Sequence, residues 1–345
     1  MRKIILAIAL FIFAGSFANA ANDFDFAVGE VVGIDDEVAT IELIDGREIS
    51  VKSNSDFATS ENQLPVVGEK FVVGQFEMGG EKIWQIYDRY RLAELLGIFG
   101  IFVLVLIAVG GWRGLSALAG LAVSIGAIIF GIVPALAAGD PPLAVALVGG
   151  AGIAGATIFI AHGFNFRSLL AFVATILTLG IAALFAVFAT NFAALFGTGS
   201  EESFYLAGAL FENLDLRGLL LAGILLGALG VLDDITVGGI TTVDELLRAN
   251  PDLSRRELFE KSLRVGREHI ASMVNTLALA YAGVALPLIL LFSVDGNQPI
   301  WALVNSEFAA EEIVRTLVGS FALVLAAPLA SGLGAFFLKN RTRRN

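Results

Sequence analysis

The sequence predicts a polytopic α-helical membrane protein with a small β-domain near its N-terminus. Hydrophobic residues make up 57% of the 345 positions and charged residues only 16%, whereas proteins average roughly 25% charged residues. The mean hydropathy of +0.81 agrees with this class. Long uncharged stretches begin after residue 91, while residues 21–90 alternate apolar and polar side chains and carry frequent charges. The expected fold is therefore all-α within a membrane, with one exported β-domain.

Composition also excludes several functions. The net charge of −11 argues against nucleic acid as a partner. The chain has no cysteine and two histidines, which excludes disulfide frameworks, thiol catalysis and histidine-rich metal centres. The sequence contains no Walker A, HExxH or GxSxG motif. We therefore expect neither an enzyme activity nor a cofactor.

Residues 1–20 have the features of a signal peptide. Arg2 and Lys3 precede a short apolar core, and Ala18-Asn19-Ala20 is a small-x-small cleavage site. Whether it is cleaved or retained, such a segment delivers the residues that follow it across the membrane. We therefore expect the β-domain to be extracytoplasmic.

The β-domain shows one hairpin signal and several strand signals. Asp45-Gly46 is the turn pair of a two-residue hairpin, because alternating apolar residues flank it on both sides. Further strand signals lie at Val66-Val67, at residues 71–73 and at residues 83–86, with Gly79-Gly80 as another turn. Two roles stay open for this domain, a structural cap on the membrane part and a module that binds a ligand or partner.

Seven apolar segments follow, each close to the ~20 residues that cross a bilayer. They form a transmembrane domain at residues 91–338, with predicted spans at about 94–111, 115–137, 143–162, 168–192, 217–237, 270–292 and 315–338. Lysine and arginine gather in the first, third and fifth connections and after the last span, whereas acids dominate the other connections. By the positive-inside rule the N-terminus lies outside, and the connection at 238–269 and the basic tail at 339–345 are cytoplasmic.

Two adjacent carboxylates are the strongest functional signal within the spans. Asp233 and Asp234 follow the uncharged run 218–232, and an ionisable residue at membrane depth indicates a functional site. Helical residues rise ~1.5 Å each, so this run covers roughly 23 Å of a ~30 Å core. The acids therefore lie in the last third of the bilayer or at its edge. Thr236 and Gly238-Gly239 predict a helix break just afterwards; alternatively, the helix ends at the interface and both acids are solvated.

The cytoplasmic connection contains two predicted helix starts. Thr242 with Glu245, and Ser254 with Glu257, have the spacing of capping boxes. Asn250-Pro251 separates them, because the residue before a proline avoids helical geometry. We therefore expect two helices, the second of which runs on toward the sixth span.

The sixth span adds two polar side chains, Asn275 and Thr276, just inside its predicted start. Asp233 and Asn275 flank the same connection, so they lie at a similar predicted depth. Carboxylates, hydroxyls and a carboxamide that converge there supply oxygen ligands for a hard cation or a proton. The candidate binding site is Asp233, Asp234, Thr236, Asn275 and Thr276. The alternative role of Asn275 is an interhelical hydrogen bond.

Four stretches of the chain are distinctive. They are Tyr87-Asp88-Arg89-Tyr90-Arg91, Trp112-Arg113-Gly114-Leu115, the segment 227–237 around Leu232-Asp233-Asp234-Ile235, and the segment 266–288 with Arg267-Glu268-His269 and Asn275-Thr276. In these stretches the chain resembles the YibE/F-like family of bacterial multipass membrane proteins. The resemblance implies an integral protein of the bacterial plasma membrane, and it supplies neither a substrate nor an active site.

The expected function is that of a membrane transporter or permease component for a small solute or ion. Asp233 and Asp234 would be its coupling carboxylates, buried toward the third and sixth spans. The alternative is a non-transport sensor or scaffold whose exported β-domain binds a partner and whose acids are exposed to water. Expected partners are the lipid bilayer and a small ion or solute, with a second copy of the chain or a partner subunit left open.

Overall fold

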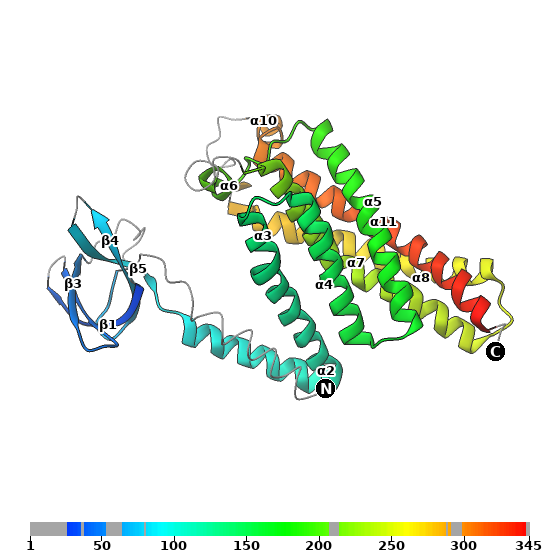
Figure 1. Cartoon of the computed structure of the whole chain (residues 1–345), viewed down its shortest axis with the longest axis horizontal. Coiled ribbons are helices and arrows are strands. Elements are labelled where there is room, and N and C mark those ends of the chain that lie inside the picture. The colour runs from blue at the N-terminus through cyan, green and yellow to red at the C-terminus, as the bar shows by residue number, and fades with distance from the viewer. Residues whose placement is uncertain are drawn as a thin grey trace. The chain divides into compact units, whose positions relative to one another are not determined.

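A computed structural model describes residues 26–35, 38–52, 64–78, 81–206, 214–287, 289–290 and 299–342. The predicted signal peptide at residues 1–20 lies outside the described residues. The chain divides into two compact units, one that ends at Leu115 and one that begins at Ser116. The first contains a β-sheet and the second a helical bundle (Figure 1).

In the described part of the β-domain there are five antiparallel strands: β1 (Phe26–Asp35), β2 (Val38–Leu43), β3 (Glu48–Lys52), β4 (Lys70–Met78) and β5 (Glu81–Arg89). Their order in the sheet is β3-β2-β1-β4-β5, and the two edge strands contact each other, so the sheet curls into a small barrel (Figure 1). Alternate residues of a strand point to the same side, and Val31, Ile41 and Val73 fill the interior at no more than 1% exposure. The predicted small β-domain is therefore confirmed as a sheet.

Two details of the predicted β-domain differ. Asp45-Gly46 does form a turn, but the loop covers residues 44–47, because the Leu43 N–H donates a 2.8 Å hydrogen bond to the Arg47 carbonyl. Val66-Val67 belongs to an exposed turn and not to a strand, since Gly68 follows with φ +89° and redirects the chain. The predicted turn at Gly79-Gly80 lies outside the described residues.

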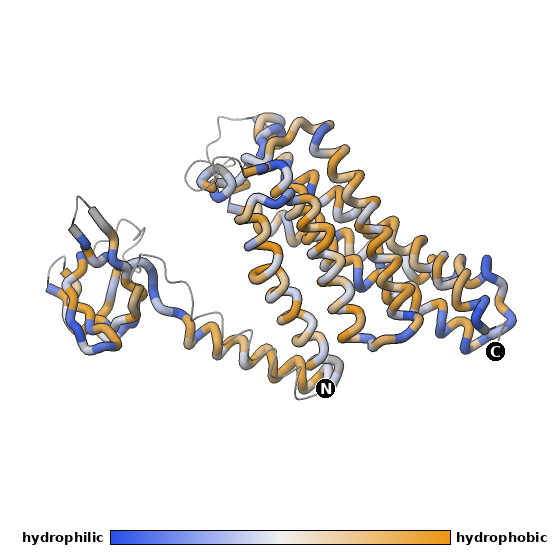
Figure 2. Tube along the Cα trace, viewed as in Figure 1, coloured by the Kyte–Doolittle hydropathy of each residue, from blue (hydrophilic) through white to orange (hydrophobic). Residues whose placement is uncertain are grey.

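The other described elements are helices. They are α2 (Leu92–Ala127), the π-helix η2 (Ile128–Ile132), α3 (Val133–Ala137), α4 (Pro142–His162), α5 (Phe166–Phe192), α6 (Glu201–Tyr205), α7 (Leu216–Ala249), α8 (Arg255–Val284), α10 (Ile300–Val304) and α11 (Glu307–Thr342). Six segments are long and apolar enough to cross a membrane: Leu92–Trp112, Gly114–Ala137, Pro142–His162, Phe166–Phe192, Leu216–Ala249 and Glu307–Arg341. Figure 2 shows hydrophobic residues along the bundle and hydrophilic residues gathered at its end near the C-terminus.

The predicted membrane class is confirmed, and the number of candidate spans within the described residues is six instead of seven. The difference is the predicted sixth span at 270–292. That segment overlaps α8, which begins with a charged stretch and ends at Val284. Residues 288, 291 and 292 lie outside the described part of the chain, so only part of this predicted span is described.

Two local irregularities interrupt the first two candidate spans. Gly111 has φ 55° and ψ −133°, a conformation that glycine adopts at far lower cost than other residues. It stands just before the predicted connection at Trp112-Arg113-Gly114. The π-helix η2 ends two residues before Pro134 and contains Phe130, four residues before it. Proline lacks the N–H that an α-helix requires and collides with the carbonyl four residues earlier, which accounts for the irregularity.

α7 runs unbroken from Leu216 to Ala249, so the predicted break after Thr236 and the predicted helix start at Thr242 are wrong. Packing explains why Gly238-Gly239 does not end the helix. A Cβ on Gly239 would lie 3.0 Å from the Ala330 Cβ in α11, so this glycine lets the two helices approach closely. The Thr242 hydroxyl donates a 2.8 Å hydrogen bond back to the Gly238 carbonyl, within the helix.

α7 is the central helix of the bundle, and α4, α5, α8 and α11 pack around it (Figure 1). Small side chains in α11 make this packing close. Ala322, Ala326 and Ala330 recur every four residues and are fully buried, which places them on one face of the helix. One turn beyond Ala330, a Cβ on Gly334 would lie 3.2 Å from Val243. These contacts fix the rotation of α7 and therefore the direction in which its polar side chains point.

α8 begins at the predicted capping box. The Ser254 hydroxyl accepts a 3.2 Å hydrogen bond from the Glu257 N–H, and the Glu257 carboxylate accepts one of 2.8 Å from the Ser254 N–H. The Ser254 N–H, and after it the Ser254 hydroxyl, hold the pKa of the Glu257 carboxyl below its ordinary value. Because the pKa is lowered in the folded state, this stabilisation is complete above the ordinary pKa of 4.5 and is lost as the pH falls through the folded value.

Ser254→Ala is expected to loosen the first turn of α8. Loss of a serine N-cap costs ~1 kcal/mol, so amide hydrogen exchange at residues 255–258 should accelerate roughly fivefold at neutral pH. The same turn should loosen in the unsubstituted protein at acid pH, when Glu257 is protonated. Ser272→Ala, in the exposed middle of α8, is the control. Unchanged exchange in Ser254→Ala would contradict the role of the cap.

Gly239→Val is expected to destabilise the bundle, because the added methyl groups would collide with Ala330 in α11. Overpacking of this kind costs roughly 1–3 kcal/mol and should lower the unfolding temperature in detergent. Gly238→Val is the matched control, since a Cβ at Gly238 meets no described atom within 4 Å. Equal unfolding temperatures for the two variants would show that close approach at Gly239 is unimportant.

Candidate functional site

Asp233 is half-buried where α7 faces α4. The Thr157 hydroxyl of α4 donates a 2.7 Å hydrogen bond to Asp233 Oδ2. The other carboxylate oxygen, Oδ1, is buried and accepts no hydrogen bond from the described residues. A buried acceptor without a partner costs roughly 1–3 kcal/mol. This oxygen therefore remains open to a proton, a cation or a water molecule.

Thr236, one turn further along α7, extends the polar site toward α5. Its hydroxyl oxygen lies 2.8 Å from that of Thr175, and both side chains are fully buried. The Thr236 hydroxyl also donates a 3.2 Å hydrogen bond to the Asp233 carbonyl. We name Asp233, Thr236, Thr157 and Thr175 the Asp233 cluster. Its side chains offer one carboxylate and three hydroxyls, all of which are oxygen donors to a bound ion.

The structure brings together two of the five predicted site residues, Asp233 and Thr236. Asp234 is exposed, because adjacent residues of a helix point about 100° apart. Asn275 and Thr276 are exposed on α8, since Leu277 is the buried position at this level. No hydrogen bond joins either of them to Asp233 in the described part of the chain, and the Thr276 hydroxyl donates to the Ser272 carbonyl of its own helix. The expected convergence of α8 on this site is therefore not observed.

Thr157 and Thr175 belong to the site but were not predicted from the sequence. Thr157 has a clear signal in hindsight, because it is the only hydroxyl in the uncharged stretch of α4. Thr175 is one of several hydroxyls in α5, and its selection depends on which helix face meets α7. A single sequence does not specify that face.

The Asp233 cluster lies within the bundle and not at a helix end. Thr157 stands five residues before His162, the last residue of α4, which is about 7.5 Å at the helical rise. α7 continues for a further four turns beyond Asp233, to Ala249. The alternative of a helix that stops at the interface with two solvated acids therefore does not describe Asp233.

One face of α5 carries a line of buried hydroxyls beside the cluster. Ser168, Thr175 and Thr178 are spaced by seven and three residues, which places them on the same helix face. All three are no more than 3% exposed. The Ser168 Oγ has no hydrogen-bond partner among the described residues. Polar atoms therefore lie on this face of α5 at the cluster and again at the first turn of the helix, with buried Ala171 between them.

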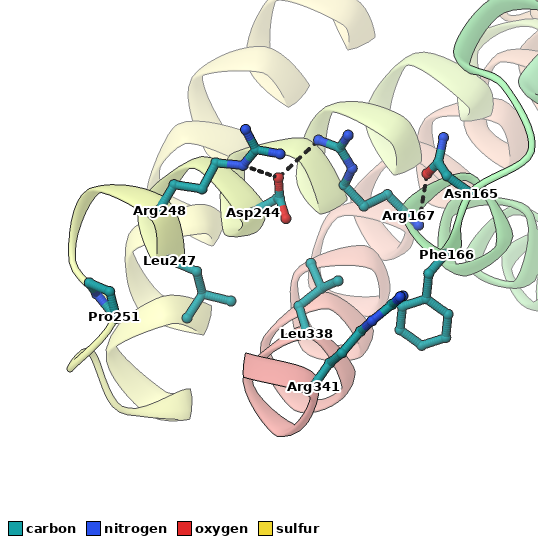
Figure 3. A pocket seen from close by; sticks show the side chains of 9 residues that line it. All are labelled: Asn165, Phe166, Arg167, Asp244, Leu247, Arg248, Pro251, Leu338 and Arg341. Atoms are coloured by element: carbon teal, nitrogen blue, oxygen red, sulfur yellow. Dashed lines mark hydrogen bonds and ion pairs between the residues drawn. The ribbon is translucent and has the colours of Figure 1, made fainter. Parts of the chain in front are cut away.

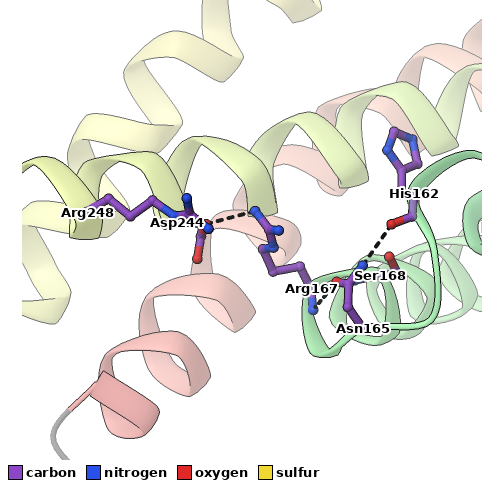
Figure 4. Close-up of polar contacts among 6 residues, drawn as sticks. All are labelled: His162, Asn165, Arg167, Ser168, Asp244 and Arg248. Carbon is purple, nitrogen blue, oxygen red and sulfur yellow. Dashed lines mark hydrogen bonds and ion pairs between the residues drawn. The ribbon is translucent and has the colours of Figure 1, made fainter. Parts of the chain in front are cut away.

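That first turn belongs to an end of the bundle that is rich in arginine and lysine. We call the α4–α5 turn, the last turns of α7 and α11, the α7–α8 connection and the first two turns of α8 the basic end. Asn165 caps α5 by accepting hydrogen bonds from the Arg167 and Ser168 N–H groups, each 3.0 Å long. Asp244 Oδ2 accepts from Arg167 and from Arg248, each at 2.9 Å, and so ties α5 to α7 (Figure 4).

Helices able to span a membrane, with a carboxylate and hydroxyls packed among them, define a polytopic helical membrane protein with an internal polar site. Within the described residues, no group of three or more histidine, aspartate or glutamate side chains is arranged to hold a metal ion.

The family model for YibE/F-like proteins matches residues 98–340, and the chain belongs to that family. This match covers α4, α5, α7 and α8 in full and α11 except for its last two residues, and it includes the Asp233 cluster. No match to the chain is found among curated proteins or among solved structures.

Thr236→Val is expected to destabilise the protein, and Thr276→Val is not. The first substitution removes a buried hydroxyl that contacts Thr175 and the Asp233 carbonyl. Hydrogen bonds of this kind contribute roughly 0.5–1.5 kcal/mol. Thr276 is exposed and bonds only within its own helix, so the same change there is the control. Thermal unfolding in detergent measures both, and equal effects would contradict the assignment of Thr236 to the cluster.

Proposed function

We propose that this protein is a transporter or permease component for a small ion or solute, and that the Asp233 cluster binds the coupling proton or cation. The observation that carries the proposal is Asp233 Oδ1, a buried carboxylate oxygen that accepts no hydrogen bond from the described residues. Carboxylates at membrane depth are costly and are typical of ion and proton pathways. Asp233 is the coupling carboxylate in this proposal, and Asp234 has no part in binding.

The chemistry of the cluster suits a hard cation or a proton. Thr157 already donates to Oδ2, so Oδ1 is the oxygen left to accept a proton or coordinate a cation. The Thr175 and Thr236 hydroxyls lie on the adjoining face of the site and offer neutral oxygen ligands, which hard cations prefer. A bound ion would restore the interaction that the buried acceptor lacks, and its release would leave the carboxylate charged.

The hydroxyls of α5 support a route between this site and the basic end. Ser168 and Thr175 lie on one face of the helix and are both buried. Seven residues separate them, or about 10.5 Å at the helical rise. Ser168 Oγ has no described hydrogen-bond partner and is therefore available to relay a proton or to hold a water molecule beside the first turn of α5.

Charge distribution supports an orientation as part of the same proposal. Basic side chains gather at the basic end, among them Arg167, Arg248, Arg255, Arg256, Lys261, Lys339 and Arg341. By the positive-inside rule that end faces the cytoplasm. An extracytoplasmic β-domain then requires seven crossings, the six candidate segments and the predicted span at 270–292. We propose the bacterial plasma membrane as the location of the protein.

The proposal predicts different behaviour for the two adjacent aspartates. In purified protein, the cation that couples transport should raise the unfolding temperature of the unsubstituted protein and of Asp234→Asn. Asp233→Asn should show no shift. Ligand at a hundred times its Kd stabilises the native state by about 2.7 kcal/mol, which thermal unfolding in a panel of cations detects. If the ion is a proton, the response to pH should be lost in Asp233→Asn alone.

Flux completes this test. Reconstituted protein should dissipate a gradient of the ion identified by unfolding, and Asp233→Asn should abolish that flux while Asp234→Asn retains it. An Asp233→Asn variant that responds to ions and carries flux like the unsubstituted protein would overturn the proposal. The sensor or scaffold function of the exported β-domain would then be the one to pursue.

A further inference from the structure

A pocket at the basic end is lined by residues from three separate helices. It has a volume of about 680 Å³ and lies among the start of α5, the end of α7 with Pro251, and the end of α11 (Figure 3). Ligand sites for small molecules have volumes of roughly 300–1,000 Å³, so the pocket has room for an anionic group and the moiety that carries it. It is distinct from the Asp233 cluster, because it shares no residue with it.

Positive charge dominates this pocket. Its described lining holds three arginines, Arg167, Arg248 and Arg341, but a single carboxylate, Asp244. Asp244 is shared by Arg167 and Arg248, and both use the same oxygen, Oδ2, at 2.9 Å. One carboxylate neutralises one of the three arginines, which leaves two positive charges around the cavity. In Figure 3 the side chains of Arg167 and Arg248 are directed toward Asp244, and Arg341 lies beside Phe166.

Arg341 is held in place without an acidic partner. Its guanidinium carbon lies 5.2 Å from the centre of the Phe166 ring, a cation–π contact. No carboxylate of the described residues lies within 4.0 Å of it. A planar guanidinium positioned by an aromatic ring keeps its N–H donors free for a ligand. Arg248 donates to Asp244 through Nε, so its two terminal nitrogens remain available to a ligand.

We infer that this pocket binds a phosphate group. Arginine forks match the geometry of phosphate oxygens and form charge-assisted hydrogen bonds with them. The surplus of two positive charges suits the charge of a phosphate ester. Two sources share this chemistry, the headgroup of an anionic phospholipid at the membrane surface and a soluble phosphate compound. The inference does not depend on ion binding at Asp233.

Binding is tested on the full chain, purified and delipidated in an uncharged detergent. In the first arm, inorganic phosphate is titrated at constant ionic strength against the unfolding temperature. In the second arm, native mass spectrometry compares phosphatidylglycerol with zwitterionic phosphatidylcholine. We expect saturable binding in at least one arm and a preference for phosphatidylglycerol in the second. Binding of phosphatidylglycerol without inorganic phosphate identifies a headgroup site, and binding of inorganic phosphate identifies a site for soluble phosphates.

Three variants locate the site. Arg341→Gln should weaken binding roughly tenfold, the loss expected for one charge-assisted hydrogen bond. Asp244→Asn removes the competing carboxylate and should tighten binding at least about twofold, a gain that a misfolded protein would not show. Arg256→Gln is the matched control, because Arg256 lies outside the pocket and pairs with Glu260 at 2.7 Å.

Several results would overturn the inference. They are an absence of saturable binding in both arms, equal binding by Arg341→Gln and the unsubstituted protein, and an equal loss in Arg256→Gln. Equal or weaker binding by Asp244→Asn would also count against it. An equal loss in Arg256→Gln would mean that the net charge of the surface governs binding, and a failure of Asp244→Asn to tighten binding would mean that Asp244 does not compete with the ligand for the arginines of this pocket.

Discussion

The close approach of α7 and α11 is the constraint on which the rest of the bundle depends. It is made by small residues on both helices, where Gly239 meets Ala330 and Gly334 meets Val243. Helices in a membrane gain little from excluding water, so van der Waals packing of this kind must hold them together. Once α7 is seated against α11, its rotation is set. Asp233 and Thr236 then point toward α4 and α5, whose hydroxyls complete the polar site.

Local sequence patterns correctly predicted the structural features that depend on the local sequence. The apolar stretches gave the membrane class, and the alternation before residue 91 gave the β-domain. The capping box at Ser254 marked the start of α8. The similar pattern at Thr242 did not start a helix, and Gly238-Gly239 did not end one. In both cases the contact of α7 with α11 outweighs the local preference. A glycine at a helix interface stabilises the fold through close packing by more than it destabilises its own helix.

The candidate site shows the same difference between what the local sequence determines and what the packing of the helices determines. Depth in the membrane was enough to single out Asp233 and Thr236. For the other residues, the helix face on which they lie determines whether they join the site. Asn275 and Thr276 lie at a suitable place in the sequence but on the exposed face of α8. Thr157 and Thr175 enter the site from helices that are far away in the chain, and pairing them with Asp233 requires the folded bundle.

The contrast between Asp233 and Asp234 has a mechanical consequence. The two carboxylates are adjacent, yet one is bonded inside the bundle and the other faces outward. To exchange them, α7 would have to rotate by about 100°. Such a rotation would lift Gly239 off Ala330 and move Thr236 away from Thr175. The bundle therefore opposes an exchange of the two acids at one position, so Asp233 keeps its place in the site unless the neighbouring helices themselves move.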